Sequence, residues 1–240
     1  MLPEPQTLAF HASLQWLEAS SLEMLRMSLK GNLCGKTAVV SSFGAESAIL
    51  LHLVSRIAPD APVLFVDTKM MFQETLDYQI ELAGKFGLSN VSIVSADQVE
   101  LRRNDVFGRL HKNDPDACCN LRKTKPLERA LASFDAWISG RKRHQSQSRV
   151  TMKPMEVDES GKVKLNPMLH WDHDDIKAYF DLYHLPCHPL TSKGFTSIGC
   201  APCTAKPLEG QDARSGRWQG QEKTECGIHV VNGKIIRQSA

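Results

Sequence analysis

Short apolar runs alternate along the chain with longer segments in which apolar positions recur every three or four residues. Four runs have the length and composition of buried strands: residues 37–43, 63–66, 91–94 and 135–139. Three segments have helical spacing: residues 8–30, 48–54 and 74–86. Because short strands alternate with helices, the pattern favours an α/β fold with a parallel sheet and helices on both faces.

The middle of the chain carries three further elements. A helical pattern begins near a pair of adjacent cysteines and runs to about Ser133. Residues 150–166 are typical of a hairpin around a glycine-containing turn. Asp172, with Asp175 three residues later, has the sequence of a helix N-terminal cap. We therefore expect another helix to start directly after Asp172.

The last part of the chain has a different composition. From about Ala205 it is polar and rich in glycine, with few apolar side chains to anchor it. We therefore expect a nucleotide-binding α/β domain over residues 1–204 and a flexible C-terminal tail over residues 205–240.

Composition narrows the class of protein further. The 240 residues are 42% hydrophobic and 23% charged, which is ordinary for a soluble globular protein. A net charge of only +2 predicts no general attraction to nucleic acid. No apolar run approaches the roughly 18 residues that cross a bilayer, and the N-terminus lacks the pattern of a secretory signal. Seven cysteines without even spacing do not predict a disulfide framework, so we expect a reducing cytoplasm and no membrane.

Two strand ends carry candidate ligand-binding residues. The loop Ser41-Ser42-Phe43-Gly44-Ala45-Glu46-Ser47 joins a strand to a helix and has the form of an anion-binding loop. It lacks the Gly-Lys-Ser/Thr element of a Walker A loop, and a purely structural turn is the alternative. Asp67 follows the second strand, where open α/β sheets bind ligands, and could accept hydrogen bonds from ribose or adenine. A helix cap is the alternative for Asp67.

Four cysteines form a candidate metal-binding set. Cys118 and Cys119 are adjacent, and Cys200 and Cys203 form a CxxC pair. Adjacent cysteines do not readily close a disulfide on each other, because the allowed bridge geometry is narrow, but both can face a cluster. Iron–sulfur clusters and zinc both accept four thiolates, although a vicinal pair is unusual for zinc. Unliganded buried cysteines are the third possibility.

Three other cysteines and one lysine complete the candidate chemistry. Lys123 lies one helical turn beyond the adjacent cysteines, where its ammonium could lie near a cluster and an anionic ligand, or simply be exposed. Cys226 lies in the polar segment Glu225-Cys226-Gly227-Ile228-His229, where a basic neighbour would favour its thiolate. This predicts a mobile nucleophile, with a spare surface thiol as the alternative. Cys34 and Cys187 have no partner motif, and their roles stay open.

The motifs, taken in order, resemble those of a known enzyme family. They are SFGAES, VDTKMMFQET, CCNLRKTKPL, GRKRHQSQSR, SIGCAPCT, ARSGRW and ECGIH, and they extend from about residue 37 to residue 229. The chain thereby resembles the assimilatory adenylyl-sulfate reductases, the iron–sulfur branch of a family that also contains phosphoadenylyl-sulfate reductases. The order of the motifs is specific, although no single one would be.

The resemblance implies a fold, a cofactor and a mechanism. The fold would be that of the adenine-nucleotide α-hydrolases, and a 4Fe–4S cluster would be bound by Cys118, Cys119, Cys200 and Cys203. Cys226 would attack the sulfur of adenylyl sulfate and displace AMP, and thioredoxin or a glutaredoxin-like reductant would release sulfite from the S-sulfocysteine. Lys123 would act between cluster and substrate, and a homo-oligomer is expected. The expected substrate-binding residues are Ser41, Ser42, Phe43, Gly44, Glu46, Asp67, Arg149, Arg214, Arg217 and His229.

Two other functions compete with this one. The first is reduction of phosphoadenylyl sulfate, the 3′-phosphorylated substrate, although family members with four cluster cysteines usually prefer the unphosphorylated one. The second is a zinc-binding nucleotide sensor without catalysis, which would explain the thiolates and the loop but not Cys226 in ECGIH. Colour distinguishes the two metals, since a zinc protein is colourless and an iron–sulfur protein is brown.

Overall fold

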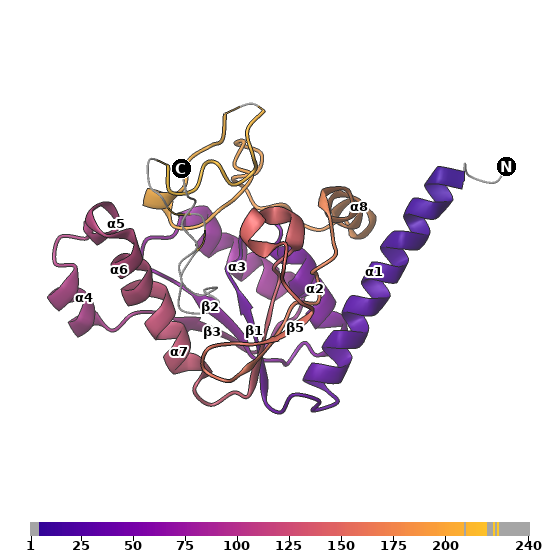
Figure 1. Cartoon of the computed structure of the whole chain (residues 1–240), viewed down its shortest axis with the longest axis horizontal. Helices are drawn as coiled ribbons and strands as arrows, with labels where there is room; N and C mark the ends of the chain where they lie inside the picture. The colour runs from indigo at the N-terminus through magenta and orange to yellow at the C-terminus, as the bar shows by residue number, and fades with distance from the viewer. Residues whose placement is uncertain (1–4, 209, 220–222, 224, 226–240) are drawn as a thin grey trace.

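The computed structural model describes residues 5–208, 210–219, 223 and 225, with side chains from residue 10 onward. Its centre is a six-stranded sheet in the order β3-β2-β1-β4-β6-β5 (Figure 1). The strands are β1 (Thr37–Ser41), β2 (Val63–Val66), β3 (Val91–Val94), β4 (Ala136–Ser139), β5 (Met155–Val157) and β6 (Val163–Leu165). All neighbours pair in parallel except β5, which runs antiparallel to β6 at the edge. The predicted α/β fold and the predicted hairpin are both confirmed.

Helices cover both faces of the sheet, because alternate strand residues point to opposite sides. Four helices pack on one face: α1 (Pro5–Leu29), α2 (Ser47–Ile57), α3 (Gln73–Lys85) and α8 (His173–Tyr183). This face buries Val39, Phe65 and Ile138 in the main core. Ala38 and Trp137 point the other way, into a smaller cluster with α7 (Lys125–Leu131). The predicted cap of α8 is confirmed, since Asp172 and Asp175 bond each other's backbone N–H groups.

The structure adds short helices that the sequence pattern did not predict. They are α4 (Gln98–Asn104), α5 (Leu110–Asn113) and three 3₁₀ turns at Arg143–Gln145, Gln147–Arg149 and Ala201–Cys203. The helices α4 and α5 were missed because they are short and largely exposed, so they carry almost no apolar periodicity. The expected continuous helix to Ser133 is instead α6 (Pro115–Cys119), a π-helical turn (Asn120–Thr124) and α7.

The parallel strands end at one edge of the sheet, and this edge carries the predicted motifs. The loop after β1, the residues after β2 and the basic loop after β4 all lie there. The segment from about residue 196 onward, orange to yellow in Figure 1, passes over the same end of the molecule. Within the described residues, no helix is both long enough and apolar enough to span a membrane.

Candidate active site

A cavity of about 420 Å³ opens at the carboxyl ends of β1 and β4. Its walls come from four parts of the chain that are distant in sequence. They are residues 40–47, residues 139–149, residues 196–199 and residues 212–218, with further contributions that include Lys123 and Glu225. Cationic side chains dominate the lining, so the cavity is suited to a small anionic ligand.

The loop after β1 contributes its small residues to the cavity. Ser41, Ser42, Gly44 and Glu46 line it, at the N-terminal end of α2. Phe43 does not: its ring is fully buried and packs on Phe65 with ring centroids 5.1 Å apart. The backbone at Phe43 has a φ of 49°, in the left-handed region, and this conformation lets the loop turn at the cavity edge.

Asp67 was expected to contact the nucleotide, but it lies outside the cavity lining. Its carboxylate accepts hydrogen bonds from the Lys69 N–H at 2.8 Å and from Lys69 Nζ at 2.7 Å. The carboxylate therefore caps the turn after β2 and not a helix, since α3 begins at Gln73, and its expected contact with the nucleotide stays a prediction.

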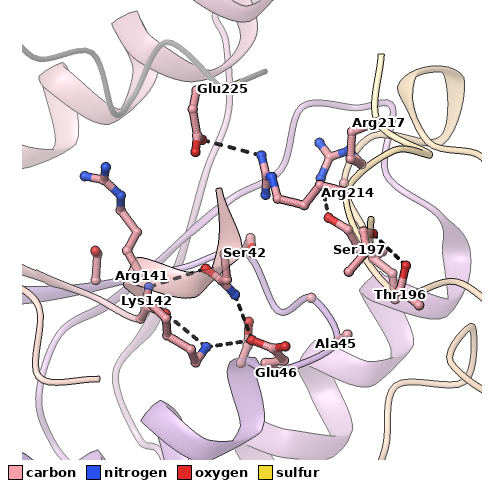
Figure 2. A pocket seen from close by; sticks show the side chains of 18 of the residues that line it. Ser42, Ala45, Glu46, Arg141, Lys142, Thr196, Ser197, Arg214, Arg217 and Glu225 are labelled. Carbon is pink, nitrogen blue, oxygen red and sulfur yellow. Dashed lines mark hydrogen bonds and ion pairs between the residues drawn. The ribbon is translucent and has the colours of Figure 1, made fainter. Parts of the chain in front are cut away.

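Glu46 forms a charged cluster on the cavity floor. Its Oε2 accepts hydrogen bonds from Lys142 Nζ at 2.7 Å and from Gln145 Nε2 at 2.8 Å (Figure 2). Burial alone would raise the pKa of Glu46, but the charge and hydrogen bond of Lys142 outweigh it and lower the pKa. Glu46 is thus an anion in the free protein, and Lys142 is the partner that sequence reasoning did not assign to the site.

Glu225 lies in the cavity and is bound there as an anion. Arg149 donates to it through Nε at 2.6 Å and through Nη2 at 2.9 Å, and Arg214 donates at 3.4 Å (Figure 2 shows the Arg214 contact). The hydroxyls of Ser146 and Ser148 donate to the same carboxylate at 2.9 and 3.2 Å. Burial would raise the pKa of Glu225, yet these donors lower it to about 2.

Arg141 is a buried cation on the cavity wall that was not among the predicted site residues. Its side chain is only 5% exposed, and Nε and Nη1 have no hydrogen-bond partner among the residues that the structure describes. Burial and the neighbouring charge of Arg149 lower the pKa of Arg141 to about 10, so it stays charged at neutral pH. In Figure 2 its side chain and that of Lys142 extend in opposite directions.

Arg217 and Trp218 connect the cavity to the CxxC loop. The guanidinium of Arg217 lies 4.5 Å from the centre of the Trp218 ring, and the N–H of Trp218 donates to the carbonyl of Cys203 at 3.1 Å. A Cβ at Gly199 would lie 2.2 Å from Arg217 Nη2, so a side chain at this position would force the guanidinium to shift. Residues on both sides of the expected domain boundary are therefore in contact, and the boundary at residue 204 stays a prediction.

The four motif cysteines line one small second cavity. Cys118 and Cys119 reach it from α6, and Cys200 and Cys203 reach it from the turn after residue 199. Burial, opposed by the charge of Arg122 and reinforced by the neighbouring Cys200 and Cys203, raises the pKa of the Cys118 thiol to about 11. A compensating positive charge, such as that of bound metal, is therefore needed to keep this set ionised.

The four thiols form a donor set around a common space. Among the described residues, no three histidine, cysteine or acidic side chains are grouped closely enough to hold a metal ion. All four motif cysteines nevertheless line the same cavity. Four thiolates are a donor set that both iron–sulfur clusters and zinc accept.

The helix beside this cavity contains an unusual turn. Pro126 lacks the N–H that would bond the carbonyl four residues earlier, and the π-helical turn Asn120–Thr124 directly precedes this region. One face of the helix then lines the cysteine cavity: Pro115, Cys118, Cys119, Arg122 and Lys123. Lys123 also lines the larger cavity, as do Arg217 and Trp218, so these side chains lie between the two.

Arg122 connects three segments around the cysteines. It donates to Asp105 through Nη2 at 2.6 Å and to the carbonyl of Thr68 through Nη1 at 3.0 Å. The Thr68 hydroxyl lies 3.2 Å from the sulfur of Cys200. These contacts of Arg122 could not be predicted from the sequence, because Asp105 and Thr68 are far from Arg122 along the chain.

Four predicted residues remain to be placed. Cys226 and His229 lie outside the described residues, so their assigned roles stay predictions. Cys34 is half-buried at the edge of the main core, and Cys187 is exposed. Neither of the latter lines the cysteine cavity.

Comparison with known proteins identifies the family. The model of the phosphoadenosine phosphosulfate reductase domain matches residues 36–206. An adenosine 5′-phosphosulfate reductase of Mesorhizobium japonicum is 43% identical over 209 residues, covering 87% of this chain and 82% of its own length. A phosphoadenosine 5′-phosphosulfate reductase of Gloeobacter violaceus is 38% identical, covering 94% of this chain and 95% of its own.

Solved structures agree on the fold. The crystal structure of phosphoadenylyl-sulfate reductase from Candida auris, in a phosphate complex, has a TM-score of 0.66 at 24% identity and covers 85% of this chain and 99% of that one. The sheet order and the strand-end loops are those of an adenine-nucleotide α-hydrolase-like fold. The chain belongs to the phosphoadenosine phosphosulfate reductase family, which confirms the resemblance that its motifs carry.

Proposed function

We propose that the protein reduces adenylyl sulfate to sulfite and AMP in sulfate assimilation, through an S-sulfocysteine on Cys226. The observation that carries the proposal is the shared wall between a cationic, nucleotide-sized cavity and a four-cysteine cavity, formed by Lys123, Arg217 and Trp218. Relatives named adenosine 5′-phosphosulfate reductase, at 43% and 45% identity, support the substrate.

Cys118, Cys119, Cys200 and Cys203 would hold a 4Fe–4S cluster. When bound, the cluster would supply an electrostatic environment for the substrate and needs no redox change in this scheme. The donor set supports the assignment, since the four thiols surround one buried cavity. Lys123 lines both cavities and would bring a positive charge to the substrate from the cysteine side.

The larger cavity would bind the nucleotide and its phosphosulfate group. The backbone of the loop from Ser41 to Ser47 offers N–H groups at the start of α2, where anions are stabilised. Arg149, Arg214 and Arg217 would hold the phosphate and sulfate oxygens, because guanidinium groups bind such oxygens in pairs. These charges would also stabilise the charge that develops on the leaving AMP.

The chemistry requires three displacements at sulfur. The Cys226 thiolate would attack the sulfate sulfur, a bond from Sγ to sulfur would form, and AMP would leave with the electrons of the broken sulfur–oxygen bond. A dithiol reductant of the thioredoxin type would then attack Sγ, release sulfite with the bonding electron pair and form a mixed disulfide. Its second thiol would close its own disulfide and restore Cys226. This reductant, a homo-oligomer and a cytoplasmic location remain parts of the proposal.

Phosphoadenylyl sulfate is the second candidate substrate. The Gloeobacter relative with a 38% identical sequence is named for that activity, so the family comparison alone leaves both nucleotides open. Adenylyl sulfate is favoured because the relatives that are 43% and 45% identical carry the name adenosine 5′-phosphosulfate reductase.

Sulfite release tests the proposal. Protein purified without air is expected to be brown, to contain iron and acid-labile sulfide, and to release sulfite from adenylyl sulfate in the presence of thioredoxin. Phosphoadenylyl sulfate in the same assay measures the preference. Colourless, zinc-containing protein that releases no sulfite from either nucleotide would support the sensor alternative instead.

A further inference from the structure

The anion site built by the basic loop is occupied by a carboxylate of the protein itself. Arg149 is 5% exposed, and each of its three nitrogens donates to a protein oxygen. Nε and Nη2 donate to Glu225, and Nη1 donates to Gln145. Three of the five N–H groups of Arg149 are thus used within the protein, and its paired Nε–Nη2 edge is occupied while Glu225 is in place.

The same residues carry the proposed contact with the phosphosulfate group. If Arg149 and Arg214 bind substrate oxygens, as the proposed function requires, Glu225 cannot keep its present hydrogen bonds. A buried guanidinium binds a carboxylate, a phosphate or a sulfate through the same paired geometry, so the groups are exchangeable. Two anions on one guanidinium would also repel each other in this poorly solvated place.

We propose that Glu225 is a positioning residue that occupies the sulfate-binding arginines in the free protein, and that the phosphosulfate group of the substrate displaces it. The inference rests on the proposed function. It adds an exchange: the protein's own carboxylate is the ligand that the substrate replaces. Glu225 directly precedes Cys226 in the sequence, so the exchange couples substrate binding to release of the residue next to the nucleophile.

Neighbouring charges make the exchange energetically reasonable. The cations around the site are Arg141, Arg149, Arg214 and Lys164. Glu225 and Glu156 are the carboxylates that act on Arg141, and Glu156 and Asp158 are those that act on Lys164. The dianionic phosphosulfate brings one more negative charge than Glu225 takes away. It could also pair with Arg141, whose Nε and Nη1 have no partner among the described residues. The gain offsets the loss of the Glu225 contacts.

A measurable consequence follows from mass action. If the arginines are free of Glu225 for only part of the time, the apparent affinity for adenylyl sulfate is reduced by that fraction. Removing the carboxylate should therefore tighten substrate binding while it slows turnover, because the residue next to Cys226 is no longer placed. If Glu225 instead stayed in place during catalysis and helped to hold the substrate, removing its carboxylate would weaken the binding of adenylyl sulfate.

The test compares Glu225→Gln, Glu225→Asp and the control Glu81→Gln, which removes a carboxylate from the exposed surface of α3. Each variant is purified as holoenzyme without air. For calorimetry each also carries Cys226→Ser, so that adenylyl sulfate binds without reacting. We expect Glu225→Gln to lower the Kd for adenylyl sulfate at least about fivefold. Adenosine, which has no anion, should bind unchanged, and Glu225→Asp and Glu81→Gln should stay close to the parent.

Kinetics with intact Cys226 give the second readout. Glu225→Gln should lower both KM and kcat for adenylyl sulfate, a split that general damage to the fold would not produce. An unchanged or raised Kd in Glu225→Gln, with parent protein that binds adenylyl sulfate and releases sulfite, overturns the exchange and leaves the proposed function intact. Parent protein that neither binds nor reduces adenylyl sulfate overturns both.

Discussion

Arg122 and Asp105 form a buried ion pair that fixes the helix of the adjacent cysteines to the loop before α5. Their side chains are 7% and 2% exposed, and two guanidinium nitrogens of Arg122 donate to one carboxylate oxygen. Burial would raise the pKa of Asp105, but Arg122 and the N–H of Leu110 outweigh it and lower the pKa. The pair therefore positions Cys118 and Cys119, two of the four motif cysteines, as well as the fold around them.

Breaking this pair should be costly. Arg122→Met leaves the Asp105 carboxylate buried without its cation, so we expect the free energy of unfolding to fall by about 3 kcal/mol. Urea denaturation of the protein measures the loss. The control is Arg129→Met, which breaks the exposed pair with Glu100 and should cost less than about 1 kcal/mol. Equal losses in the two variants would contradict the assigned role of Arg122.

Gly199 should be essential for substrate binding. A Cβ in Gly199→Ala would lie 2.2 Å from Arg217 Nη2, so the guanidinium must leave its place on the cavity wall. We expect the KM for adenylyl sulfate to rise about tenfold or more, equivalent to the loss of one charge-assisted contact. Gly84→Ala in α3 is the matched control, since nothing lies within 4 Å of its added methyl group. The same KM in both variants would show that Arg217 does not contact the substrate.

Arg141 should lower the stability of the free protein and strengthen the binding of adenylyl sulfate. Its buried Nε and Nη1 lack partners among the described residues, so Arg141→Met should raise the free energy of unfolding and weaken binding of adenylyl sulfate. Arg143 is the control in the same loop, because it donates to the carbonyl of Met152 at 2.7 and 3.0 Å. Arg143→Met should lower stability. Chemical denaturation and calorimetry measure both quantities, and a destabilised Arg141→Met would refute this account of the residue.

Lys164 should give the protein a pH-dependent stability. Burial, followed by the charge of Arg141, lowers the pKa of Lys164 to about 7, against about 10.4 in an unfolded chain. Between these values the unfolded state binds more protons than the folded state, so stability rises as pH increases from 7 to 10. Denaturation across this range should show the rise in the wild-type protein and a smaller one in Lys164→Met. Parallel pH profiles would contradict the lowered pKa.

Residue patterns were sufficient to predict the strands of the sheet and the two cysteine pairs, because strands and cysteine spacing are local features of the sequence. Buried strands leave contiguous apolar runs, and Ser and Gly after β1 indicate a loop that a ligand can approach. The cysteines on α6 and around the CxxC loop follow from spacing along a helix and a turn. Such features depend on residues close together in the sequence. This is why the sequence predicts the loop after β1 and the two cysteine pairs.

The features that could not be predicted depend on long-range packing. The sequence predicts Phe43 in the nucleotide loop, but neither the burial of its ring nor the positive φ of its backbone has a sequence signature in a residue other than glycine or asparagine. The pairing of Arg149 with Glu225 joins residues 76 positions apart. Arg141 differs from the equally buried Lys142 and Arg149 in that its Nε and Nη1 have no partner among the described residues. Each of these required the tertiary structure.

The mass of the Cys226 peptide tests the central claim most directly. Air-free protein incubated with adenylyl sulfate, in the absence of any thiol, should gain one SO₃ group on that peptide and release one AMP for each group gained. Cys226→Ser should gain nothing. An unmodified Cys226 peptide in cluster-containing protein, with adenylyl sulfate and then with phosphoadenylyl sulfate, would contradict the proposed reductase mechanism.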